Sequence, residues 1–360
     1  MVGEGLVKIL VYGAGVLGSF YAARLAESGQ DVSILARGKR LAEIRDHGIV
    51  LESARRGIRT ATRVRAVEKL APDDVYTWVL VLMRRNQVAS ILPALAENNH
   101  TPNVLFMMNN ASGPAEMIRA LGCDRVVLGF PGAGGVREGH VIRYVAGRGG
   151  DGATATVGEP DGRVSSRLVE LEGVFAQAGF SARLEPNMDA WLKTHVALIS
   201  PLANALYMAG SDTHRLAGTR DALVLMLRAM REGLRVLRAL DIPVRPPTVQ
   251  ILAGLPEPLL VVLLQRLLDS EIAEIAIEGH ARAARDEMKQ LADEFQALAL
   301  SAGIPTPAMD CLYRFLDLTE PPVRQGSAGL PMDWRGVYAL VGSLAALLAL
   351  LNLRRLRRRR

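Results

Sequence analysis

The chain opens with a glycine fingerprint between a strand pattern and a helix pattern. Residues Leu6–Tyr12 form a run rich in aliphatic and β-branched residues, which predicts a strand, and residues Ser19–Ser28 have a helical pattern. The turn between them consists of Gly13, Ala14, Gly15, Val16, Leu17 and Gly18. In such a turn the first glycine permits the tight bend, the second lets the backbone approach a pyrophosphate, and the third allows close helix–strand packing. These six residues are therefore predicted to bind a dinucleotide at a helix N-terminus, where negative charge is favoured. The alternative is a glycine-rich loop that only packs.

The end of the next predicted strand, Asp31–Ala36, bears on which dinucleotide is bound. Sites that prefer NAD place an acidic residue near this end to hold the ribose hydroxyls. Here Arg37 follows the strand, with Lys39 and Arg40 just beyond it. A guanidinium can bind a phosphate through two parallel hydrogen bonds, so the cluster favours the 2′-phosphate of NADP. A solvated basic turn is the alternative.

Composition limits the class of protein. A chain of 360 residues, 49% of them hydrophobic and 22% charged, is long enough for two globular domains. Its net charge of +6 comes from six arginines within residues 354–360, so the remainder is formally neutral and no nucleic-acid groove is expected. The cysteines, Cys123 and Cys311, and the six histidines have no metal-binding spacing. We therefore expect reduced thiols, a cytoplasmic protein and no metal site.

Residues 1–186 alternate strand and helix patterns. Asp74–Met83 and Val104–Met108 are nearly continuous apolar runs, which are typical of parallel strands covered on both faces. Residues 126–158 are rich in glycine and β-branched residues, with a turn at 137–139, and are expected to add antiparallel strands to the same sheet. The sequence thus predicts an α/β, Rossmann-type nucleotide-binding domain over residues 1–186.

The pattern becomes helical from residue 187. Helices are predicted over 187–209, 219–240, 247–266 and 268–302. These segments predict an all-helical second domain over residues 187–318, with the active cleft between the two domains.

The C-terminal residues have a different character. Residues 319–335 are rich in proline, glycine and serine and are expected to form a linker. Residues 336–353 carry no charge, and eighteen residues of helix would span roughly 27 Å, enough for a bilayer core. The arginine-rich tail, residues 354–360, would meet anionic lipid. We expect a transmembrane or membrane-anchor helix that holds a cytoplasmic catalytic domain; a helix buried in a dimer contact is the alternative. Arginines favour the cytoplasmic side, which conflicts with this placement, so the topology stays open.

Several motifs over residues 1–317 occur in the order and spacing of one known family. After the fingerprint and the basic turn come Val81–Val88 (VLMRRNQV), Asn109–Gly113 (NNASG), Trp191–Lys193 (WLK), Ser200–Leu202 (SPL) and Ala302–Pro307 (AGIPTP). Together they resemble the ketopantoate reductase (2-dehydropantoate 2-reductase) family. The resemblance implies a nucleotide-binding domain followed by a helical domain, and NADPH as cofactor.

The resemblance also implies roles for individual residues. Lys193 matches the family's catalytic lysine, and Asn109 and Asn110 match the loop that borders the nicotinamide. Either Glu274 or Glu278 matches a substrate-binding glutamate. Arg84 stands where the family usually has lysine, and it would meet the cofactor phosphates or a substrate carboxylate, or remain a solvated charge.

Two departures concern the substrate. Ala197 stands where the family has an asparagine, four residues after the lysine, and Ser200 replaces the asparagine before the proline. At 100° per residue, Ser200 and Asn204 fall within about 40° of Lys193 on a helix, so both are expected to bind substrate and Asn204 to supply the missing amide. These departures put ketopantoate itself in doubt.

These observations lead to an NADPH-dependent reductase that transfers hydride to a 2-keto acid or a similar small carbonyl compound. An ammonium at Lys193 would stabilise the charge that develops on the carbonyl oxygen and deliver the proton. One alternative is a dehydrogenase of the same fold acting on another hydroxy or amino acid. Another is a membrane-tethered NADP-binding sensor or scaffold without catalysis, which the alanine at position 197 would favour. A homodimer is suggested only by analogy with such folds.

Overall fold

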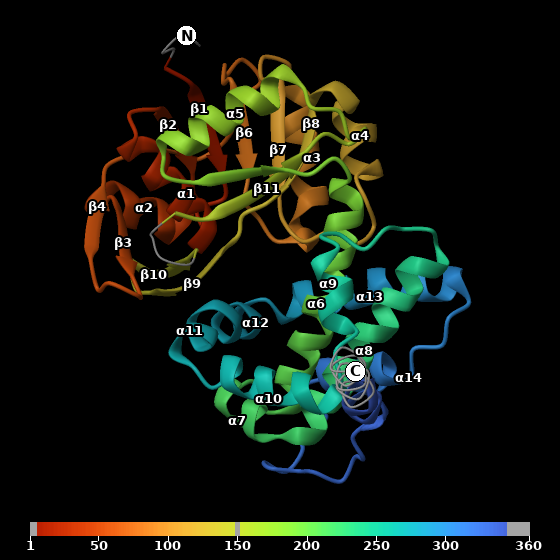
Figure 1. Cartoon of the computed structure of the whole chain (residues 1–360). Coiled ribbons are helices and arrows are strands. Elements are labelled where there is room, and N and C mark those ends of the chain that lie inside the picture. The colour runs from red at the N-terminus through yellow and green to blue at the C-terminus, as the bar shows by residue number, and fades with distance from the viewer. Residues whose placement is uncertain (1–5, 148–151, 344–360) are drawn as a thin grey trace, which may run out of the picture.

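The structure is a computed structural model that describes residues 6–147 and 152–343. Figure 1 shows two lobes, one built on a sheet and one built of helices, with the helix α6 (Met188–Met208) running from the first into the second. This arrangement confirms the expected fold, a Rossmann-like sheet domain followed by a helical domain. The exact residue at which the domains divide stays a prediction.

The sheet lobe is organised around a large, mostly parallel sheet. In spatial order its strands are β12 (Ser181–Leu184), β11 (Thr154–Gly158), β8 (Val126–Phe130), β7 (Asn103–Met107), β6 (Trp78–Val81), β1 (Lys8–Tyr12), β2 (Asp31–Leu35) and β5 (Arg65–Val67). The strands from β8 to β5 are parallel, and β11 pairs antiparallel with β8. The carboxyl ends of β1, β6 and β7 therefore meet at one edge, where ligands bind in open α/β sheets.

A second sheet stands apart from the first. Its order is β4 (Arg59–Thr62), β3 (Ile49–Ser53), β10 (Val141–Ala146) and β9 (Ala133–Glu138). The expectation that residues 126–158 all extend the main sheet was therefore wrong in part. β8 and β11 do so, whereas β9 and β10 form the predicted hairpin around 137–139, and β10 pairs with β3 instead. Gly134 and Gly135 allow this: a Cβ on Gly135 would come within 2.5 Å of Arg143 O, so only glycine permits the close approach.

Helices cover both faces of the large sheet. They are α1 (Val16–Glu27), α2 (Gly38–His47), η1 (Arg85–Gln87), α3 (Val88–Glu97), α4 (Ala115–Leu121), η2 (Cys123–Arg125) and α5 (Ser166–Gln177). One core packs α1 and α5 against one face, and another packs α3 and α4 against the other. Both cores consist of aliphatic and aromatic side chains that are almost fully buried, the condition under which parallel strands read as continuous apolar runs.

The helical lobe has its own core. Its helices are α6, α7 (Thr213–Gly218), α8 (Arg220–Ala239), α9 (Thr248–Ala253), α10 (Glu257–Leu268), α11 (Glu271–Ala273), the π-helical turn η3 (Glu274–Glu278), α12 (Gly279–Ala283), α13 (Arg285–Ala302), α14 (Pro307–Tyr313) and η4 (Arg314–Leu316). Met188 and Leu192 at the start of α6 pack with the sheet, whereas the rest of α6 packs in the helical core. The first turns of α6 therefore lie where the two lobes meet.

Two of the predicted helices are interrupted. The segment 247–266 divides into α9 and α10, because Pro256 and Pro258 start a new helix. The segment 268–302 contains η3, and α12 ends at Ala284, whose φ and ψ of −130° and 35° are not helical. Here a Cβ on Gly279 would lie 2.1 Å from Val136 Cγ1, so the glycine lets α12 lie directly on β9 of the other lobe.

The predicted linker is attached to the helical lobe along much of its length. Asp221 accepts hydrogen bonds from Gly329 N (3.0 Å) and Leu330 N (2.8 Å), and Val323 N donates to Met208 O (3.0 Å). Residues 335–343 are helical. Among the described residues, none of the helices has both the length and the apolar character that crossing a bilayer requires. Most of the predicted membrane segment and the whole arginine tail, residues 344–360, lie outside the described residues.

Candidate active site

The fingerprint turn has the geometry that a dinucleotide needs. Gly13 has φ +116°, and a Cβ there would lie 2.7 Å from Leu82 O on the neighbouring strand end. A Cβ on Gly18 would lie 1.8 Å from Gly13 O, so helix α1 can approach the strand only because this residue is glycine. By contrast, a Cβ on Gly15, the N-cap of α1, would meet nothing within 4 Å. That open space in front of unpaired helix N–H groups fits a pyrophosphate.

The cations of the basic turn after β2 differ in burial: Arg40 is enclosed, whereas Arg37 is exposed and donates a hydrogen bond to Glu68 O (3.5 Å). Arg40 is buried, and its Nε and Nη2 donate to Ala14 O (3.2 Å) and Ser19 Oγ (3.0 Å), so its guanidinium stabilises the fingerprint turn. Arg37 is exposed at the N-terminus of α2, where its charge lies near the Tyr12 hydroxyl. Burial raises the pKa of Tyr12, and the positive charge of Arg37 opposes that rise. Of the cluster, Arg37 is thus the guanidinium that remains accessible to a ligand.

A depression of about 700 Å³ adjoins this turn. Its lining residues are Arg37, Gly38, Leu41, Ala42, Arg45, Asp46, Glu68 and Lys69. Three of these are cations and two are carboxylates, one of which, Glu68, pairs with Arg45 (3.7 Å), so the lining carries only a small positive excess.

The residues after β6 join the two lobes. Arg84 donates to Asp286 Oδ1 (3.1 Å) and to Ala283 O (2.5 Å), and Asn86 donates to Asp286 Oδ2 (2.7 Å). Partial burial of Asp286 would raise its pKa, but the Asn86 hydrogen bond and the Arg84 charge outweigh it and the pKa is lowered. Arg84 is therefore engaged with the helical lobe in this structure, whereas its predicted partners were the cofactor phosphates or a substrate carboxylate.

Arg85, next to it, is buried and connects three segments. Its backbone N–H donates to Glu287 Oε1 (3.1 Å), its Nη2 donates to Ser112 Oγ (2.8 Å), and its Nε lies 3.1 Å from Glu294 Oε1. Glu287 and Glu294 both belong to α13, so the strand end is held to the helical lobe by buried charge.

The loop after β7 is held in place by both lobes. Asn110 is a structural residue: its Oδ1 accepts from Gly113 N (3.0 Å) and its Nδ2 donates to Gly113 O (2.9 Å). From the helical lobe, Glu294 Oε2 accepts from the N–H groups of Ala111 (3.0 Å) and Ser112 (3.1 Å). Asn109 Oδ1, in contrast, is buried and has no hydrogen-bond partner among the described residues. Such an orphaned acceptor at the sheet edge fits a hydrogen bond from a bound ligand.

Lys193 lies against this loop. Its Nζ forms an ion pair with Asp189 Oδ2, one helical turn earlier on α6, and its side chain is only 12% exposed. A Cβ on Gly113 would be 3.5 Å from Lys193 Nζ and 3.2 Å from Asp189 Oδ1. The structure therefore brings the predicted ammonium to the carboxyl end of β7, beside the loop that carries Asn109.

Ser200 and Asn204 lie elsewhere on α6. They line a cavity of about 10 Å³, enclosed by Pro201 of α6, Ala292 and Gln296 of α13, and Met309, Leu312 and Tyr313 of α14. That volume holds about one water molecule. A helix rises about 1.5 Å per residue, so Ser200 and Asn204 stand roughly 10 Å and 16 Å along the axis from Lys193. The periodicity argument considered only the angle around the helix axis and took no account of this rise.

Ala197 has a packing role. A Cβ on Gly233 of α8 would lie 3.0 Å from the Ala197 Cβ, so α6 and α8 are in close contact at this point. An asparagine at 197 has no room in this packing. Ala197, which departs from the family motif, thus packs against a second small residue, Gly233 on α8.

The two candidate glutamates of η3 act on residues of helix α7. Glu278 is buried; one oxygen accepts from Thr213 N (2.8 Å) and the other lies 2.9 Å from Arg282 Nη2, so it caps α7. Glu274 is exposed, and its charge acts on His214 of the same helix α7. In this structure neither carboxylate lies beside Lys193.

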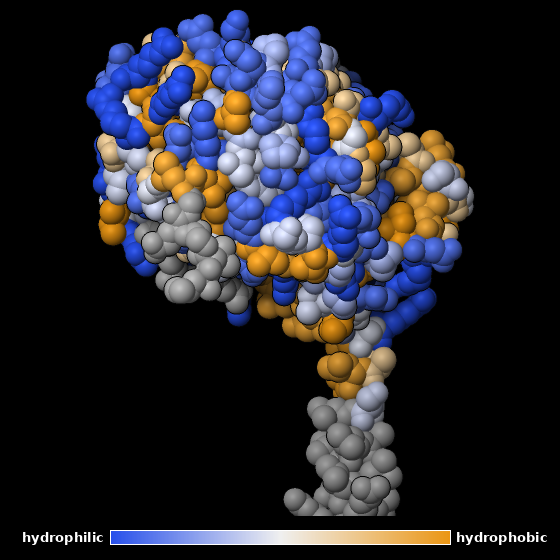
Figure 2. All heavy atoms as spheres, turned by 90° about the horizontal axis from the view of Figure 1, so that it is seen from above, coloured by the Kyte–Doolittle hydropathy of each residue, from blue (hydrophilic) through white to orange (hydrophobic). Residues whose placement is uncertain are grey.

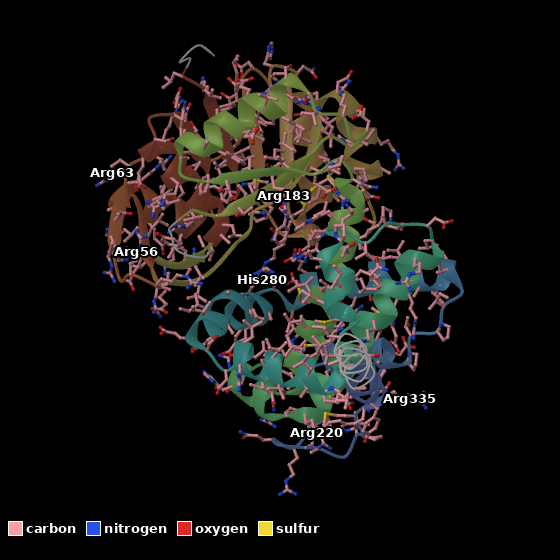
Figure 3. The ribbon with its side chains drawn as sticks, in the orientation of Figure 1. Arg56, Arg63, Arg183, Arg220, His280 and Arg335 are labelled. Carbon is pink, nitrogen blue, oxygen red and sulfur yellow. The ribbon has the colours of Figure 1, made fainter. Side chains whose placement is uncertain are left out.

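Two histidines lie near the lysine. His195 stacks on Trp191, with ring centroids 5.4 Å apart and an interplanar angle of 7°, and lies 4.2 Å from the ring of Phe130. Burial, with a smaller contribution from the charge of His280, lowers the pKa of His195 to about 4. His195 is therefore neutral at pH 7. His280 Nε2 lies 3.4 Å from Glu287 Oε2, on the side of the helical lobe that faces the sheet lobe (Figure 3).

Three residues of this site were not anticipated from the sequence. Asp189 had a local signal, because its spacing of four from Lys193 on a helix favours an ion pair. Arg85 and Glu294 are more than 200 residues apart and had none. Within the described residues, no group of histidine, cysteine, aspartate or glutamate side chains is arranged to hold a metal ion.

The fold and the site define a class: a two-lobed, Rossmann-type oxidoreductase in which a lysine from the helical lobe meets the nucleotide-binding edge of the sheet. Comparison with known proteins specifies the family. Residues 9–159 match the family model described as ketopantoate reductase PanE/ApbA. The 2-dehydropantoate 2-reductase of Mesorhizobium japonicum is 27% identical over 264 residues, which cover 64% of this chain and 77% of that relative. The resemblance to the ketopantoate reductase family is thus confirmed, with residues 9–159 matching that family's model.

Solved structures agree on the fold. The 2-dehydropantoate 2-reductase from Geobacter metallireducens superposes with a TM-score of 0.70 at 17% identity, over 86% of this chain and 98% of that one. A ternary structure of D-mandelate dehydrogenase with NADH and anilino(oxo)acetate has the same TM-score of 0.70 at 14% identity, over 86% and 97% of the two chains. At such identities these likenesses bear on the fold alone.

Proposed function

We propose that this protein is an NADPH-dependent reductase of small 2-keto acids, with Lys193 as its catalytic residue. The observation that carries the proposal is the position of the Lys193 ammonium against Gly113, at the sheet edge where the fingerprint turn and Asn109 also lie. An ammonium reaching a nucleotide-binding edge from the opposite lobe is the arrangement that carbonyl reduction needs.

The chemistry divides between cofactor and protein. NADPH held at this edge would supply the hydride that the carbonyl carbon of the substrate needs. The protein must stabilise the negative charge on the carbonyl oxygen and provide one proton, so that a 2-keto acid becomes a 2-hydroxy acid. Lys193 Nζ carries both the charge and the proton, and Asp189 fixes its position through their ion pair. The small exposed part of the lysine side chain lets solvent return the proton afterwards.

The nucleotide is held by the remaining predicted residues at this edge. The N–H groups at Gly15, Val16 and Leu17 face the open space that suits a pyrophosphate, and Asn109 Oδ1 is available to the nicotinamide end. We assign the 2′-phosphate to Arg37, because Arg40 is occupied beneath the fingerprint. Ser200, Asn204 and Glu278 are not assigned to the substrate, because each is enclosed or hydrogen-bonded elsewhere.

The decisive experiment replaces Lys193 with methionine, which preserves length but removes the charge. We expect kcat to fall roughly 10²–10⁴-fold, the usual contribution of a positioned proton donor, while the Kd for NADPH changes little. Lys289→Met is the matched control, because Lys289 also pairs with an aspartate four residues away, Asp293 (2.8 Å), but on the exposed surface of α13. Equal activity in the two variants would remove Lys193 from the mechanism. Tight NADPH binding with no turnover of any substrate by the wild type would favour a sensor or scaffold.

The cofactor assignment has its own test. Arg37→Asp is expected to weaken NADPH binding by at least tenfold and to leave NADH binding unchanged or improved, since only NADPH carries the 2′-phosphate. Exposed Arg56, distant in sequence from the turn, provides the control substitution Arg56→Asp. Equal losses for both nucleotides would contradict a phosphate role for Arg37.

A dehydrogenase of the same fold acting on a different 2-hydroxy acid is the second candidate. Ala197 favours it, because the packing of this residue on Gly233 removes an amide that the family uses. A panel containing ketopantoate, pyruvate and an aryl 2-keto acid, assayed with NADPH and NADH, separates the two candidates by kcat/KM.

We also propose that the enzyme is cytoplasmic and associates with a membrane through residues 336–360. Residues 335–343 are helical, and Tyr338, Leu340 and Val341 are 71%, 61% and 58% exposed. Beyond them the sequence continues uncharged to residue 353 and then becomes arginine-rich. A chain truncated after Asp333 keeps the attached linker and should remain in solution without detergent. If the full chain is equally soluble without detergent, the membrane proposal fails.

A further inference from the structure

Helix α10 is apolar on both of its sides. Its inner side packs Leu260, Val261 and Leu268 into the core of the helical lobe. Its outer side carries Leu259, Val262, Leu263 and Leu267, which are 45%, 46%, 47% and 62% exposed. Spacings of three and four residues place these four side chains on one stripe, which we call the outer face of α10. A helix that is apolar all round is normally buried, so this face lacks a partner in the described part of the chain.

The C-terminal segment is held at the N-terminus of α10, the end from which this face begins. Arg228 Nη2 donates to Pro331 O (2.6 Å), and Asp333 N donates to Glu257 Oε1 (3.0 Å) in the first turn of α10. At Gly336, a Cβ would lie 3.3 Å from Pro256, the N-cap of the same helix. The helix that begins at residue 335 therefore leaves the body at a fixed point next to α10, and not at the end of a free tether.

Apolar and cationic side chains lie around the exit point and along the outer face of α10. Figure 2 shows apolar residues around the place where the C-terminal helix leaves the body. Trp334 is 45% exposed, and Arg335 is exposed at the start of the helix (Figure 3). A second exposed arginine, Arg266, lies within the stripe near the other end of α10. Tryptophan and arginine beside aliphatic side chains suit the boundary between lipid tails and anionic head groups.

We propose that the outer face of α10 is a membrane-contact surface that lies on an anionic bilayer and sets the orientation of the enzyme. This inference rests on the proposed membrane association of residues 336–360. The face offers on the order of 300 Å² of apolar surface, well below the roughly 800 Å² per partner of a stable protein interface. That area is too small to hold a second copy alone, but it is sufficient as a secondary contact beside an anchor. The six arginines that follow the uncharged run supply the charge complementarity to anionic lipid.

The test uses the full chain and vesicles of phosphatidylcholine with 30% phosphatidylglycerol. Cys123 and Cys311 are first replaced by serine, and a cysteine carrying a polarity-sensitive fluorophore is placed by Leu263→Cys. Val169→Cys is the matched control, because Val169 is also an exposed aliphatic residue (51%) but lies on α5 of the other lobe. Brominated lipids quench only a fluorophore that lies in the bilayer.

We expect the protein to float with the vesicles, with emission from position 263 shifted to the blue and quenched at least twofold, and emission from position 169 unchanged. The double variant Leu263→Glu/Leu267→Glu should weaken vesicle binding by at least tenfold, whereas Val164→Glu/Val169→Glu should not. If the protein floats but positions 263 and 169 behave alike, the membrane-contact surface is refuted and the anchor survives. If the full chain does not float, both proposals fail. A dimer mass in light scattering that Leu263→Glu converts to a monomer would assign the face to a second copy instead and overturn the proposal.

Discussion

Removal of the Glu294 carboxylate should loosen the loop on which the reaction depends. Glu294 Oε2 accepts from Ala111 N and Ser112 N, and its Oε1 lies 3.1 Å from Arg85 Nε, with side-chain exposures of only 11% for the glutamate and 7% for the arginine. These contacts are the direct link between α13 and the loop that carries Asn109 and contacts Lys193. We therefore expect the substitution to affect both stability and activity.

The magnitude follows from what Glu294→Ala leaves behind. A hydrogen bond to a charged group contributes about 1.5–3 kcal/mol, and breaking a buried ion pair costs about 3–5 kcal/mol. Ser112 is exposed, so water replaces its lost acceptor, and Arg85 keeps its contact with Glu116 at 3.2 Å. We expect a loss of about 3 kcal/mol in the free energy of unfolding, and about half of that for Glu294→Gln, which keeps an acceptor oxygen without the charge.

Urea unfolding followed by circular dichroism measures this loss, and steady-state assays measure KM and kcat in the same variants. Asp293→Ala is the matched control, because the neighbouring carboxylate is 46% exposed and pairs only at the surface, where such pairs contribute under about 1 kcal/mol. We expect a higher KM for the keto acid in the Glu294 variants, since the loop bordering the substrate becomes mobile. If Glu294→Ala unfolds at the same urea concentration as Asp293→Ala, our account of how the lobes hold this loop is wrong.

Two further predictions concern the fingerprint and the buried histidine. The Gly15→Ala variant should fold with an unchanged Tm yet lose NADPH affinity by tenfold or more in titration calorimetry, because its new Cβ enters the space left for the pyrophosphate. Gly18→Ala should instead lower the Tm, because its Cβ would collide with Gly13 O. The reverse pattern would contradict the geometry. The pKa of His195 is lowered from 6.5 to about 4 by burial, so the unfolded chain takes up a proton at a higher pH than the folded chain. The free energy of unfolding should therefore fall by about 2 kcal/mol between pH 7 and pH 5, and His195→Asn should flatten this dependence in urea titrations at both pH values. Parallel losses in wild type and variant would show that His195 does not contribute.

Much of the fold follows from local patterns. The fingerprint, the strands β1, β2 and β7, and the long helices α6 and α8 were all anticipated within a few residues. Each depends on a period or a turn that neighbouring residues encode among themselves. The breaks within 268–302 were not anticipated, because η3 and Ala284 interrupt a segment whose residues all favour helix. Packing of α12 on β9 imposes that interruption, and Gly279, the residue that allows the contact, has no local signature distinguishing it from any other glycine.

For the candidate site, local sequence patterns were enough to predict the glycine turn, the cation that follows β2, and the helix and spacing that carry Lys193. It could also state that Asn204 shares a face with this lysine, but helical phase says nothing about what that face meets farther along the axis. The folded arrangement was needed to find that Ser200 and Asn204 are enclosed between helices, that Glu278 caps α7, and that Glu294 holds the loop at residues 111 and 112. These outcomes depend on how two lobes, each with its own core, are packed against each other. That packing depends on contacts between residues up to about two hundred positions apart, such as Arg85 and Glu294, and a local sequence pattern does not predict such contacts.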